Sequence, residues 1–317
     1  MAAQPLPVIA GPTAGGKTAL AIWLARQLNG EVISADSMQV YKELRVGTAR
    51  PTSEETGEIP YRLAGHVGLE EDYHVARYAA EAHAAIRDAA ARGKLPILCG
   101  GTGLYIRSVI ENLTYTDQPS SPSLREELRR RYDDEGGDAL LARLAAVDPE
   151  TAARLHPHDA GRIIRALEVY ETTGVTMAEQ QRLSHAAPSP YDVCLLVLSC
   201  RNRQTLYDRI DRRVDEMLAG GLLDEARSLL NDPRATTARQ AIGYKELAPY
   251  FSGEIPLEEA VDALKRDTRR YAKRQLSWFR AMANAEWLYS DDYDDPDGLR
   301  REALRRIREH YRKEEHR

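Results

Sequence analysis

The clearest chemical signature of the chain is a phosphate-binding loop, G-x-x-x-x-G-K-[ST], which the sequence matches at Gly11-Pro-Thr-Ala-Gly-Gly-Lys-Thr18. Its glycines let the backbone fold so tightly that successive N–H groups point at phosphate oxygens. Lys17 adds a positive charge, and the Thr18 hydroxyl is suited to a magnesium ion. An apolar run at 7–10 precedes the loop and a helical stretch at 19–29 follows it, so a helix N-terminus faces the anion. We therefore predict a phosphate-binding site. The loop does not identify the ligand, and a nucleoside triphosphate is the default, because most such loops bind one.

An aspartate follows one of the apolar strands, and its position bears on what the loop does. Enzymes that hydrolyse or transfer phosphate usually hold magnesium with an aspartate at the end of a buried strand. The stretches 95–99 and 193–198 run into glycine and serine, whereas 31–35 runs into Asp36. Because the carboxyl ends of parallel strands share one edge of a sheet, we expect Asp36 beside the phosphate loop if the two strands are close. Capping a short helix is its structural alternative.

Other polar residues have types and spacings suited to a substrate or a polyanion. Thr102 lies in a second glycine-rich turn, directly after an apolar strand. Arg162 and Arg165 are three residues apart, so both can project from one helix face, while Ile163, Ile164 and Leu167 are available for packing. A solvated basic face is the structural alternative for the two arginines. Arg209 and Arg213 have an i,i+4 spacing and could together hold a diphosphate, although ion pairs with nearby acids would also explain them.

Composition restricts the class of protein. The chain has 317 residues, 43% of them hydrophobic, which supports one large packed domain or a domain with an insertion. No apolar run approaches the roughly 18 residues that cross a bilayer, so we expect no membrane segment and a cytoplasmic location. Cys99, Cys194 and Cys200 lack C-x-x-C spacing and are expected to be buried thiols. Net charge is −5, yet 265–280 holds seven basic residues and one acid, which indicates a local polyanion site.

Hydrophobic patterning predicts an α/β fold with a mostly parallel sheet flanked by helices. In the helix expected at 257–282, we expect Trp278 and Phe279 to lie in the core and not on a base-stacking platform. The charged residues from 291 onward suggest an exposed terminal helix. Strands are expected at 7–10, 31–35, 95–99 and 192–199, and helices at 19–29, 73–92, 206–218 and 257–282.

A helical insertion interrupts this pattern. Between about 114 and 190 the strand signals vanish and amphipathic helices take their place. Proline- and serine-rich stretches at 118–122 and 187–190 bound the change. We therefore predict a core domain made of 1–113 and 191–317, with 114–190 as an inserted α-helical domain.

Together these motifs resemble the bacterial tRNA dimethylallyltransferases, also called tRNA isopentenyltransferases or the IPP transferase family. The resemblance covers most of the chain. The C-terminal part of the chain has no cysteine–histidine zinc module, so it resembles the bacterial form and not the eukaryotic one. Seven motifs occur in the family's order: Gly11 to Thr18, Asp36-Ser-Met-Gln-Val-Tyr41, Gly47-Thr-Ala-Arg-Pro51, Gly100-Gly-Thr-Gly-Leu-Tyr105, Arg162-Ile-Ile-Arg-Ala-Leu-Glu168, Ala241-Ile-Gly-Tyr-Lys-Glu246 and Arg270-Tyr-Ala-Lys-Arg-Gln275.

The resemblance implies a P-loop NTPase-like core that transfers a dimethylallyl group from dimethylallyl diphosphate to the exocyclic amine of the adenosine next to the anticodon on its 3′ side. The loop then holds a diphosphate leaving group, with Mg2+ at Thr18. Asp36 is implied as general base, with Thr102, Lys17 and Arg213 as further catalytic residues. The implied donor site comprises Gly11, Pro12, Thr13, Ala14, Gly15, Gly16, Lys17 and Thr18.

The implied partner is the anticodon stem-loop of tRNA, because a stacked adenine must leave its stack to reach a buried donor. The insertion is expected to contact the anticodon arm and the basic C-terminal helix to contact the RNA backbone, in a monomeric protein. The sequence departs from the family pattern at Gly161, usually glutamine, at Arg50, more often lysine, and at Gly65 before His66, where two histidines are usual. Implied tRNA contacts are Asp36, Ser37, Met38, Gln39, Thr102, Gly161, Arg162, Ile163, Ile164, Arg165, Gln240, Gly243, Tyr244, Lys245, Lys273 and Arg274.

Three alternatives stay open at the level of sequence. An adenylate isopentenyltransferase would use the same donor to make a free cytokinin, but would need neither the insertion nor the basic segment. A nucleotide-dependent kinase would use Asp36 as a metal ligand. A non-catalytic RNA-binding protein could hold a nucleotide in the loop for structural reasons.

Overall fold

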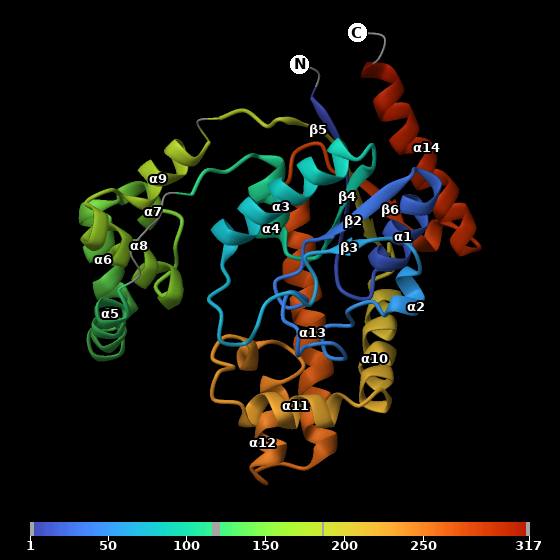
Figure 1. Cartoon of the computed structure of the whole chain (residues 1–317). Coiled ribbons are helices and arrows are strands. Elements are labelled where there is room, and N and C mark those ends of the chain that lie inside the picture. Colours follow the sequence, from blue (N-terminus) through green and yellow to red (C-terminus); the bar gives the residue numbers. More distant parts are fainter. Residues whose placement is uncertain (1–2, 116–120, 186, 315–317) are drawn as a thin grey trace. The chain divides into compact units, whose positions relative to one another are not determined.

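The computed structural model describes residues 3–115, 121–185 and 187–314, and the chain separates into two compact units (Figure 1). Met1–Ile110 and Pro190–Arg317 form the first, which we call the core unit, and Glu111–Ser189 form the second, the helical unit. The proline- and serine-rich stretch expected at 118–122 falls largely outside the described residues.

One sheet of six parallel strands forms the centre of the core unit, in the order β3-β2-β4-β1-β5-β6 (Figure 1). The predicted α/β fold with a mostly parallel sheet is confirmed. The edge strand β3 was not predicted, because it is short and lies in a polar stretch without an apolar alternation. The strands are β1 (Gln4–Ala10), β2 (Gly30–Ser34), β3 (Tyr61–Arg62), β4 (Leu95–Gly100), β5 (Tyr191–Ser199) and β6 (Glu286–Tyr289).

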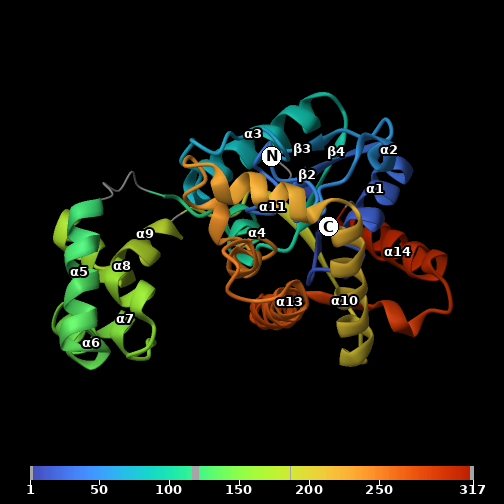
Figure 2. The same cartoon turned by 90° about the horizontal axis from the view of Figure 1, so that it is seen from below.

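The sheet separates two apolar layers, because successive side chains of a strand point to opposite faces. In β1, Val8 and Ala10 pack into the layer that includes α3 and α4, whereas Ile9 packs into the layer that includes α1 and α14. Figure 2 shows these helices on the two sides of the strands. They are α1 (Lys17–Gln27), α3 (Val75–Ala91), α4 (Gly103–Ile110) and α14 (Pro296–Glu314).

Two long helices complete the part of the core unit that matters for the site. α10 and α13 lie side by side (Figure 1). In α13, Phe279 is fully buried as predicted, but Trp278 is 37% exposed and the prediction for it is wrong. Trp278 lies on the outer side of the helix and covers Gly103, where a Cβ would press on its indole. These helices and the two that connect them are α10 (Arg203–Ala219), α11 (Leu222–Asn231), α12 (Ala248–Phe251) and α13 (Leu257–Arg280).

Strand order brings three functional segments to one edge of the sheet. β4 lies between β2 and β1, and Leu98 pairs with Ile33 on one side and with Val8 on the other. The strand ends are therefore level. The turn after β2 carries Asp36, the turn at 100–102 follows β4, and the phosphate loop follows β1, so all three lie at the carboxyl edge.

The described residues of the helical unit form five helices, and apolar side chains such as Leu144 and Ile163 form its own core. Beside that core, the carboxylate of Glu168 is fully buried and accepts hydrogen bonds from Arg125 and Arg165. A buried carboxylate needs such partners to remain charged. The helices are α5 (Pro122–Glu135), α6 (Gly137–Val147), α7 (Pro149–Ala152), α8 (Ala160–Thr173) and α9 (Met177–Ser184).

Two expectations from composition concern cysteines and membranes. Cys99, Cys194 and Cys200 are buried free thiols, as predicted. Across the described ranges, no helix combines the length and the apolar character needed to cross a membrane.

Candidate active site

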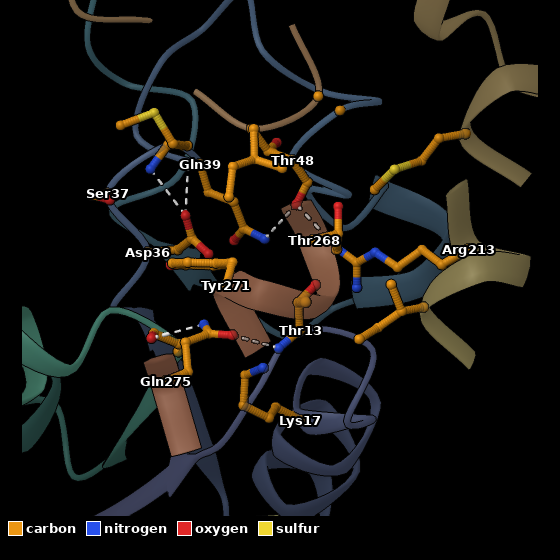
Figure 3. A pocket seen from close by; sticks show the side chains of 18 of the residues that line it. Thr13, Lys17, Asp36, Ser37, Gln39, Thr48, Arg213, Thr268, Tyr271 and Gln275 are labelled. Carbon is orange, nitrogen blue, oxygen red and sulfur yellow. Dashed lines mark hydrogen bonds between the residues drawn. The ribbon is translucent and has the colours of Figure 1, made fainter. Parts of the chain in front are cut away.

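A cavity of about 340 Å³ opens at the carboxyl edge of the sheet in the core unit. The phosphate loop and the turns after β2 and β4 line it, and α10 and α13 supply further side chains (Figure 3). Lys17 and Asp36 both reach this cavity, and α10 and α13 also present apolar groups to it. The cavity therefore suits a small substrate that has an anionic part and an apolar part.

The phosphate loop has the geometry of an anion site. Gly11, at φ 142°, passes so close to β5 that a Cβ would clash with the carbonyl oxygen of Leu198. Gly16, at φ 83°, precedes the first residue of α1 and provides no capping side chain. The N–H groups at the start of α1 therefore remain available to an anion, which the helix dipole also favours. Lys17 Nζ donates to the Pro12 carbonyl oxygen across the loop at 2.6 Å.

Two part-buried cations, Lys17 and Arg213, reach the cavity, and neither has a carboxylate partner in hydrogen-bonding contact among the described residues. Burial lowers the pKa of Lys17 to about 8. Burial likewise lowers the pKa of Arg213, whose Nη2 donates to the Thr48 carbonyl oxygen at 3.5 Å and whose Nε has no partner in the described chain. An anionic ligand would stabilise both. Arg209, the suggested companion of Arg213, does not line the cavity and donates to Ser290 Oγ at 2.7 Å. The two arginines therefore do not reach the cavity together, as holding one diphosphate would require.

Asp36 caps a turn and still presents an oxygen to the cavity. Its Oδ1 accepts hydrogen bonds from the backbone N–H groups of Met38 at 2.9 Å and Gln39 at 3.2 Å. Within the described chain, Oδ2 accepts no hydrogen bond. The structural and the catalytic interpretations of Asp36 are therefore compatible, since they use different oxygens of one carboxylate.

Thr102 acts on the site through its neighbours. Its hydroxyl oxygen accepts the backbone N–H of Ser37 at 3.0 Å and its hydroxyl donates to Ser37 Oγ at 3.4 Å. Ser37 and Gly101 line the cavity, whereas Thr102 does not. Thr102 therefore fixes the turn that carries Asp36 to the turn that follows β4.

The loop at 45–48 is held by a carboxylate. Glu225 accepts the backbone N–H groups of 45, 46 and 47 at 2.9, 2.8 and 2.8 Å, and also the hydroxyl of Tyr244 at 2.8 Å. Thr48 then accepts a hydrogen bond from Gln39 Nε2 at 3.1 Å through its carbonyl oxygen. Tyr244 is fully buried, which corrects the expectation that its side chain contacts tRNA. The side-chain amide of Gln39 likewise bonds inside the protein, although Gln39 lines the cavity.

The remaining implied tRNA residues of the core unit fall into two groups. Gln240, Gly243, Lys245 and Arg274 line the cavity together with Ser37 and Met38. Lys273 is exposed on α13 and does not line the cavity.

In the helical unit, the implied RNA-binding stretch presents only some of its side chains. Ile163 and Ile164 are buried in the core of the unit, which confirms the expectation that they are available for packing. Their side chains are therefore not the part of this stretch that could meet RNA. Arg162 is exposed, and Arg165 is part-exposed and bonds to the buried glutamate of its own helix at 3.0 Å. The space around Gly161 is open, since a Cβ there would meet nothing within 4 Å.

Several residues of the cavity were missed. Leu264, Thr268, Tyr271 and Gln275 all line it from α13 (Figure 3). Their spacings of four, three and four residues place them on one helix face, which is a signal the sequence does contain. Their mixed polarity hid the face, because only apolar residues were counted when the helix was predicted.

The residues around Thr18 fit a magnesium ion held mainly by a substrate. Thr18 lines the cavity, and the hydroxyl of Tyr61, from β3, lies close to it. Among the described residues, no three His, Cys, Asp or Glu side chains gather as a metal cluster. Magnesium in phosphate loops uses one hydroxyl, substrate phosphate oxygens and water, so a carboxylate cluster is not required.

Comparison with known sequences gives a consistent result. A family model described as IPP transferase matches residues 39–282, and one described as isopentenyl transferase matches 5–61. The chain is 46% identical over 296 residues to a tRNA dimethylallyltransferase of Caldanaerobacter subterraneus, covering 92% of this chain and 94% of that protein. It is 47% identical over 309 residues to the tRNA dimethylallyltransferase of Symbiobacterium thermophilum, covering 96% and 95%.

Solved structures agree. The full-length tRNA isopentenylpyrophosphate transferase of Bacillus halodurans superimposes with a TM-score of 0.72 at 40% identity, covering 98% of this chain and 99% of that one. A eukaryotic dimethylallyltransferase acting on tRNA superimposes with a TM-score of 0.79 at 31% identity, covering 94% of this chain and 77% of that one. The P-loop NTPase-like core is thereby confirmed.

Proposed function

The chain belongs to the IPP transferase family, and we propose how its residues perform the reaction, transfer of a dimethylallyl group to adenosine 37 of tRNA. One observation carries the assignment of roles: the phosphate loop with Lys17 and the carboxylate of Asp36 line the same cavity. A reaction that releases an anion and removes a proton needs both groups in one site.

The donor in this proposal is dimethylallyl diphosphate. The bond between C1 of the allylic group and the diphosphate oxygen breaks, and the oxygen leaves with the electron pair. A bond forms between C1 and the exocyclic N6 of adenine, and N6 then loses a proton to the base. Atoms and charge balance with diphosphate and a protonated carboxyl as the other products.

The leaving diphosphate is held by the N–H groups of the phosphate loop and by the two cations, Lys17 and Arg213, with the Thr13 hydroxyl as a further hydrogen-bond donor. These groups lie inside a cavity, where electrostatic interactions are screened less than in bulk solvent, so they stabilise charge on the leaving oxygen more strongly than solvent does. Mg2+ bound at Thr18 supplies further neutralisation of the diphosphate when present.

Asp36 is the general base. The exocyclic amine of adenine is a weak nucleophile because its lone pair is delocalised into the ring, so proton removal must accompany bond formation. Thr102 keeps Asp36 in place through Ser37, and its role is therefore to position the base.

Apolar side chains give the five-carbon group a place beside the diphosphate. Ile210, Val214 and Met217 line the cavity at i, i+4 and i+7 on α10, and Leu264 lines it from α13. The dimethylallyl tail is proposed to contact this apolar patch. The charged lining residues Lys17, Asp36 and Arg213 serve the diphosphate and the acceptor in this proposal.

The acceptor is the anticodon arm of tRNA. Arg274, Lys245 and Gln240 line the cavity and are proposed to receive the extruded nucleotide and its neighbours. Lys273 in the core unit and Arg162 in the helical unit are exposed cations, which we assign to RNA phosphates. We further propose a monomeric enzyme that works in the cytoplasm, where its RNA substrate is made.

The direct test mixes the purified protein with magnesium, dimethylallyl diphosphate labelled in the allylic group, and unmodified tRNA. Label is expected in adenosine 37 and nowhere else in the RNA. A tRNA with guanosine at that position is the matched control and should stay unlabelled.

The same assay, repeated with AMP or with ATP added, distinguishes the alternatives, which the relatives do not favour. Label in free AMP with none in tRNA would indicate a cytokinin-forming enzyme. Release of ADP from ATP would indicate a kinase. RNA binding with no transfer of label in any condition would indicate a non-catalytic protein.

A further inference from the structure

Gln275 is buried between the two turns that carry the halves of the site. Its side chain is 4% exposed. Oε1 accepts the backbone N–H of Thr13, in the phosphate loop, at 2.9 Å. Nε2 donates to the carbonyl oxygen of Gly101, in the turn after β4, at 2.9 Å. Figure 3 shows both bonds reaching out from α13. One side chain of a distant helix thus joins two strand-end loops.

The chemistry of this contact calls for an amide. One loop offers a donor and the other an acceptor, and a neutral amide supplies the matching acceptor and donor in one group. A carboxylate would accept from Thr13 but repel the carbonyl oxygen of Gly101, and a methionine would leave both backbone groups buried without a partner. Close approach is also built in, because a Cβ on Gly101 would clash with Nε2 of Gln275.

The bond to Gly101 continues to the base. The next residue, Thr102, accepts the N–H of Ser37, and Asp36 precedes Ser37 in the chain. Tyr271, one helical turn before Gln275, lines the cavity, and its hydroxyl lies close to Thr102 and Gln275. Two neighbouring residues of one helix therefore contact both the leaving-group side and the base side.

We propose that Gln275 is a positioning residue that sets the separation between the phosphate loop and the turn bearing the base, and so the distance over which the allylic group is transferred. This inference rests on the proposed function. It deepens that proposal by assigning to α13 a role in alignment in addition to contact with RNA. A displacement of about 1 Å in a reacting group can lower a rate roughly a hundredfold. Loss of the hydrogen bonds of Gln275 to the two turns should therefore lower kcat.

The test compares Gln275→Met and Gln275→Glu with the unchanged enzyme by steady-state kinetics with labelled donor and tRNA. Both variants are expected to lose about tenfold to a hundredfold in kcat at pH 7.5, with the KM for tRNA unchanged. Gln204→Met and Gln204→Glu are matched controls, because Gln204 is an exposed glutamine of α10 whose side-chain amide donates to Asp208 at 2.8 Å, outside the cavity. Both controls should keep the kcat of the unchanged enzyme.

A pH series separates alignment from a loss of folding. A protonated carboxylic acid again offers one acceptor and one donor, so the kcat of Gln275→Glu, divided by that of the unchanged enzyme, should rise as pH falls from 8 to 5.5. Division by the unchanged enzyme removes the contributions of the charged and titratable groups near Gln275 that both proteins share, among them Asp36, Lys17 and Tyr271. Gln275→Met should show a flat ratio.

A double-mutant cycle with Gly101→Ala covers the case in which Gln275→Met folds poorly. The added methyl group displaces Nε2, so Gly101→Ala should lower kcat in the unchanged enzyme and have almost no further effect in Gln275→Ala. Variants at Gln275 with the kcat of the unchanged enzyme, a flat ratio for Gln275→Glu, or additive effects in the cycle would overturn the inference. An unchanged enzyme that labels no tRNA would instead overturn the proposed function.

Discussion

The carboxylate of Glu225 accepts the hydroxyl of Tyr244 at 2.8 Å and, with the same two oxygens, three consecutive backbone N–H groups of the loop at 45–47. Gly47 allows this arrangement, since a Cβ there would press on the ring of Tyr244. The next residue, Thr48, accepts hydrogen bonds from Arg213 and Gln39 through its carbonyl oxygen. A carboxylate outside the cavity thus orients the guanidinium that we assign to the diphosphate.

Glu225→Gln is expected to weaken both the fold and the donor site. An amide presents N–H groups to part of this donor set, and an unsatisfied bond of a charged group costs about 1.5–3 kcal/mol. Urea unfolding should show a loss of about that size in the free energy of unfolding, and the KM for the donor should rise because Arg213 loses its orientation. Glu126→Gln, at an exposed position of α5, is the control and should leave both quantities unchanged. An unaltered donor KM in a destabilised Glu225→Gln would show that the loop does not orient Arg213.

Asp36→Asn should remove catalysis and preserve structure. The amide oxygen of asparagine can still accept the N–H groups of Met38 and Gln39, but the side chain no longer accepts a proton. General bases contribute about a hundredfold to ten-thousandfold, so kcat should fall by at least about two orders of magnitude. The melting temperature and the affinity for tRNA should stay close to those of the unchanged enzyme.

Asp36→Ala makes the comparison complete, because it removes the turn cap as well as the base. It should be as inactive as Asp36→Asn and also less stable, by roughly 1 kcal/mol for the lost cap. Asp36→Asn with kcat within a few-fold of the unchanged enzyme would contradict the assignment of the base.

The sequence predicted those parts of the site that are encoded locally. The phosphate loop is contiguous, so Lys17 and Thr18 are identified by spacing alone. Asp36 follows from a general property of parallel sheets, and the strand order supplies what the sequence could not: β4 lies between β2 and β1. This order is why Thr102 stands next to the turn that carries Asp36.

The parts that were missed depend on contacts between distant residues. Gln275 lies 262 positions from its partner Thr13, and Glu225 lies about 180 positions from the loop it holds. Both bond to backbone atoms, which are identical along the chain and leave no sequence signal. The family resemblance identified sequence motifs that contain site residues, but it did not indicate which side chains in a motif face the cavity. The burial of Ile163, in contrast, was predicted, because the apolar residues at 163, 164 and 167 of α8 were expected to pack.

Binding of the donor diphosphate should weaken above pH 8, and Lys17 gives the reason. Its pKa is lowered to about 8 in the free protein, mainly by burial, so the ammonium loses its proton as pH rises through 8. A bound diphosphate favours the charged form and raises this pKa. Binding above pH 8 must therefore take up a proton, and the Kd should increase by up to about tenfold per pH unit. Titration calorimetry in two buffers of different ionisation enthalpy measures this uptake.

Lys17→Arg is the matched variant for that measurement, because a guanidinium stays charged throughout the range. Its Kd for the donor should be weaker at pH 7, since the larger group fits the loop less well, but nearly constant between pH 7.5 and 9.5. The same pH dependence in both proteins would assign the titration to a group other than Lys17.

Gly65 and Arg50 should prove to be coupled. Arg50 donates to the carbonyl oxygens of Tyr41 and Lys42, and a Cβ on Gly65, at φ 62°, would overlap its guanidinium. Gly65→Ala should therefore lower the free energy of unfolding by more than the roughly 1 kcal/mol that a left-handed backbone alone costs. Gly93→Ala is the control, since its φ is 69° but its Cβ would meet nothing within 4 Å, so it should lose only the backbone cost.

The coupling is measured by repeating Gly65→Ala in an Arg50→Lys background, with urea unfolding as the readout. Lysine lacks the planar fork, so the methyl group finds space and the cost of Gly65→Ala should fall toward that of Gly93→Ala. An equal cost in both backgrounds would mean that the guanidinium moves aside freely. In that case the space taken by the guanidinium of Arg50 would not be the reason why position 65 needs a glycine.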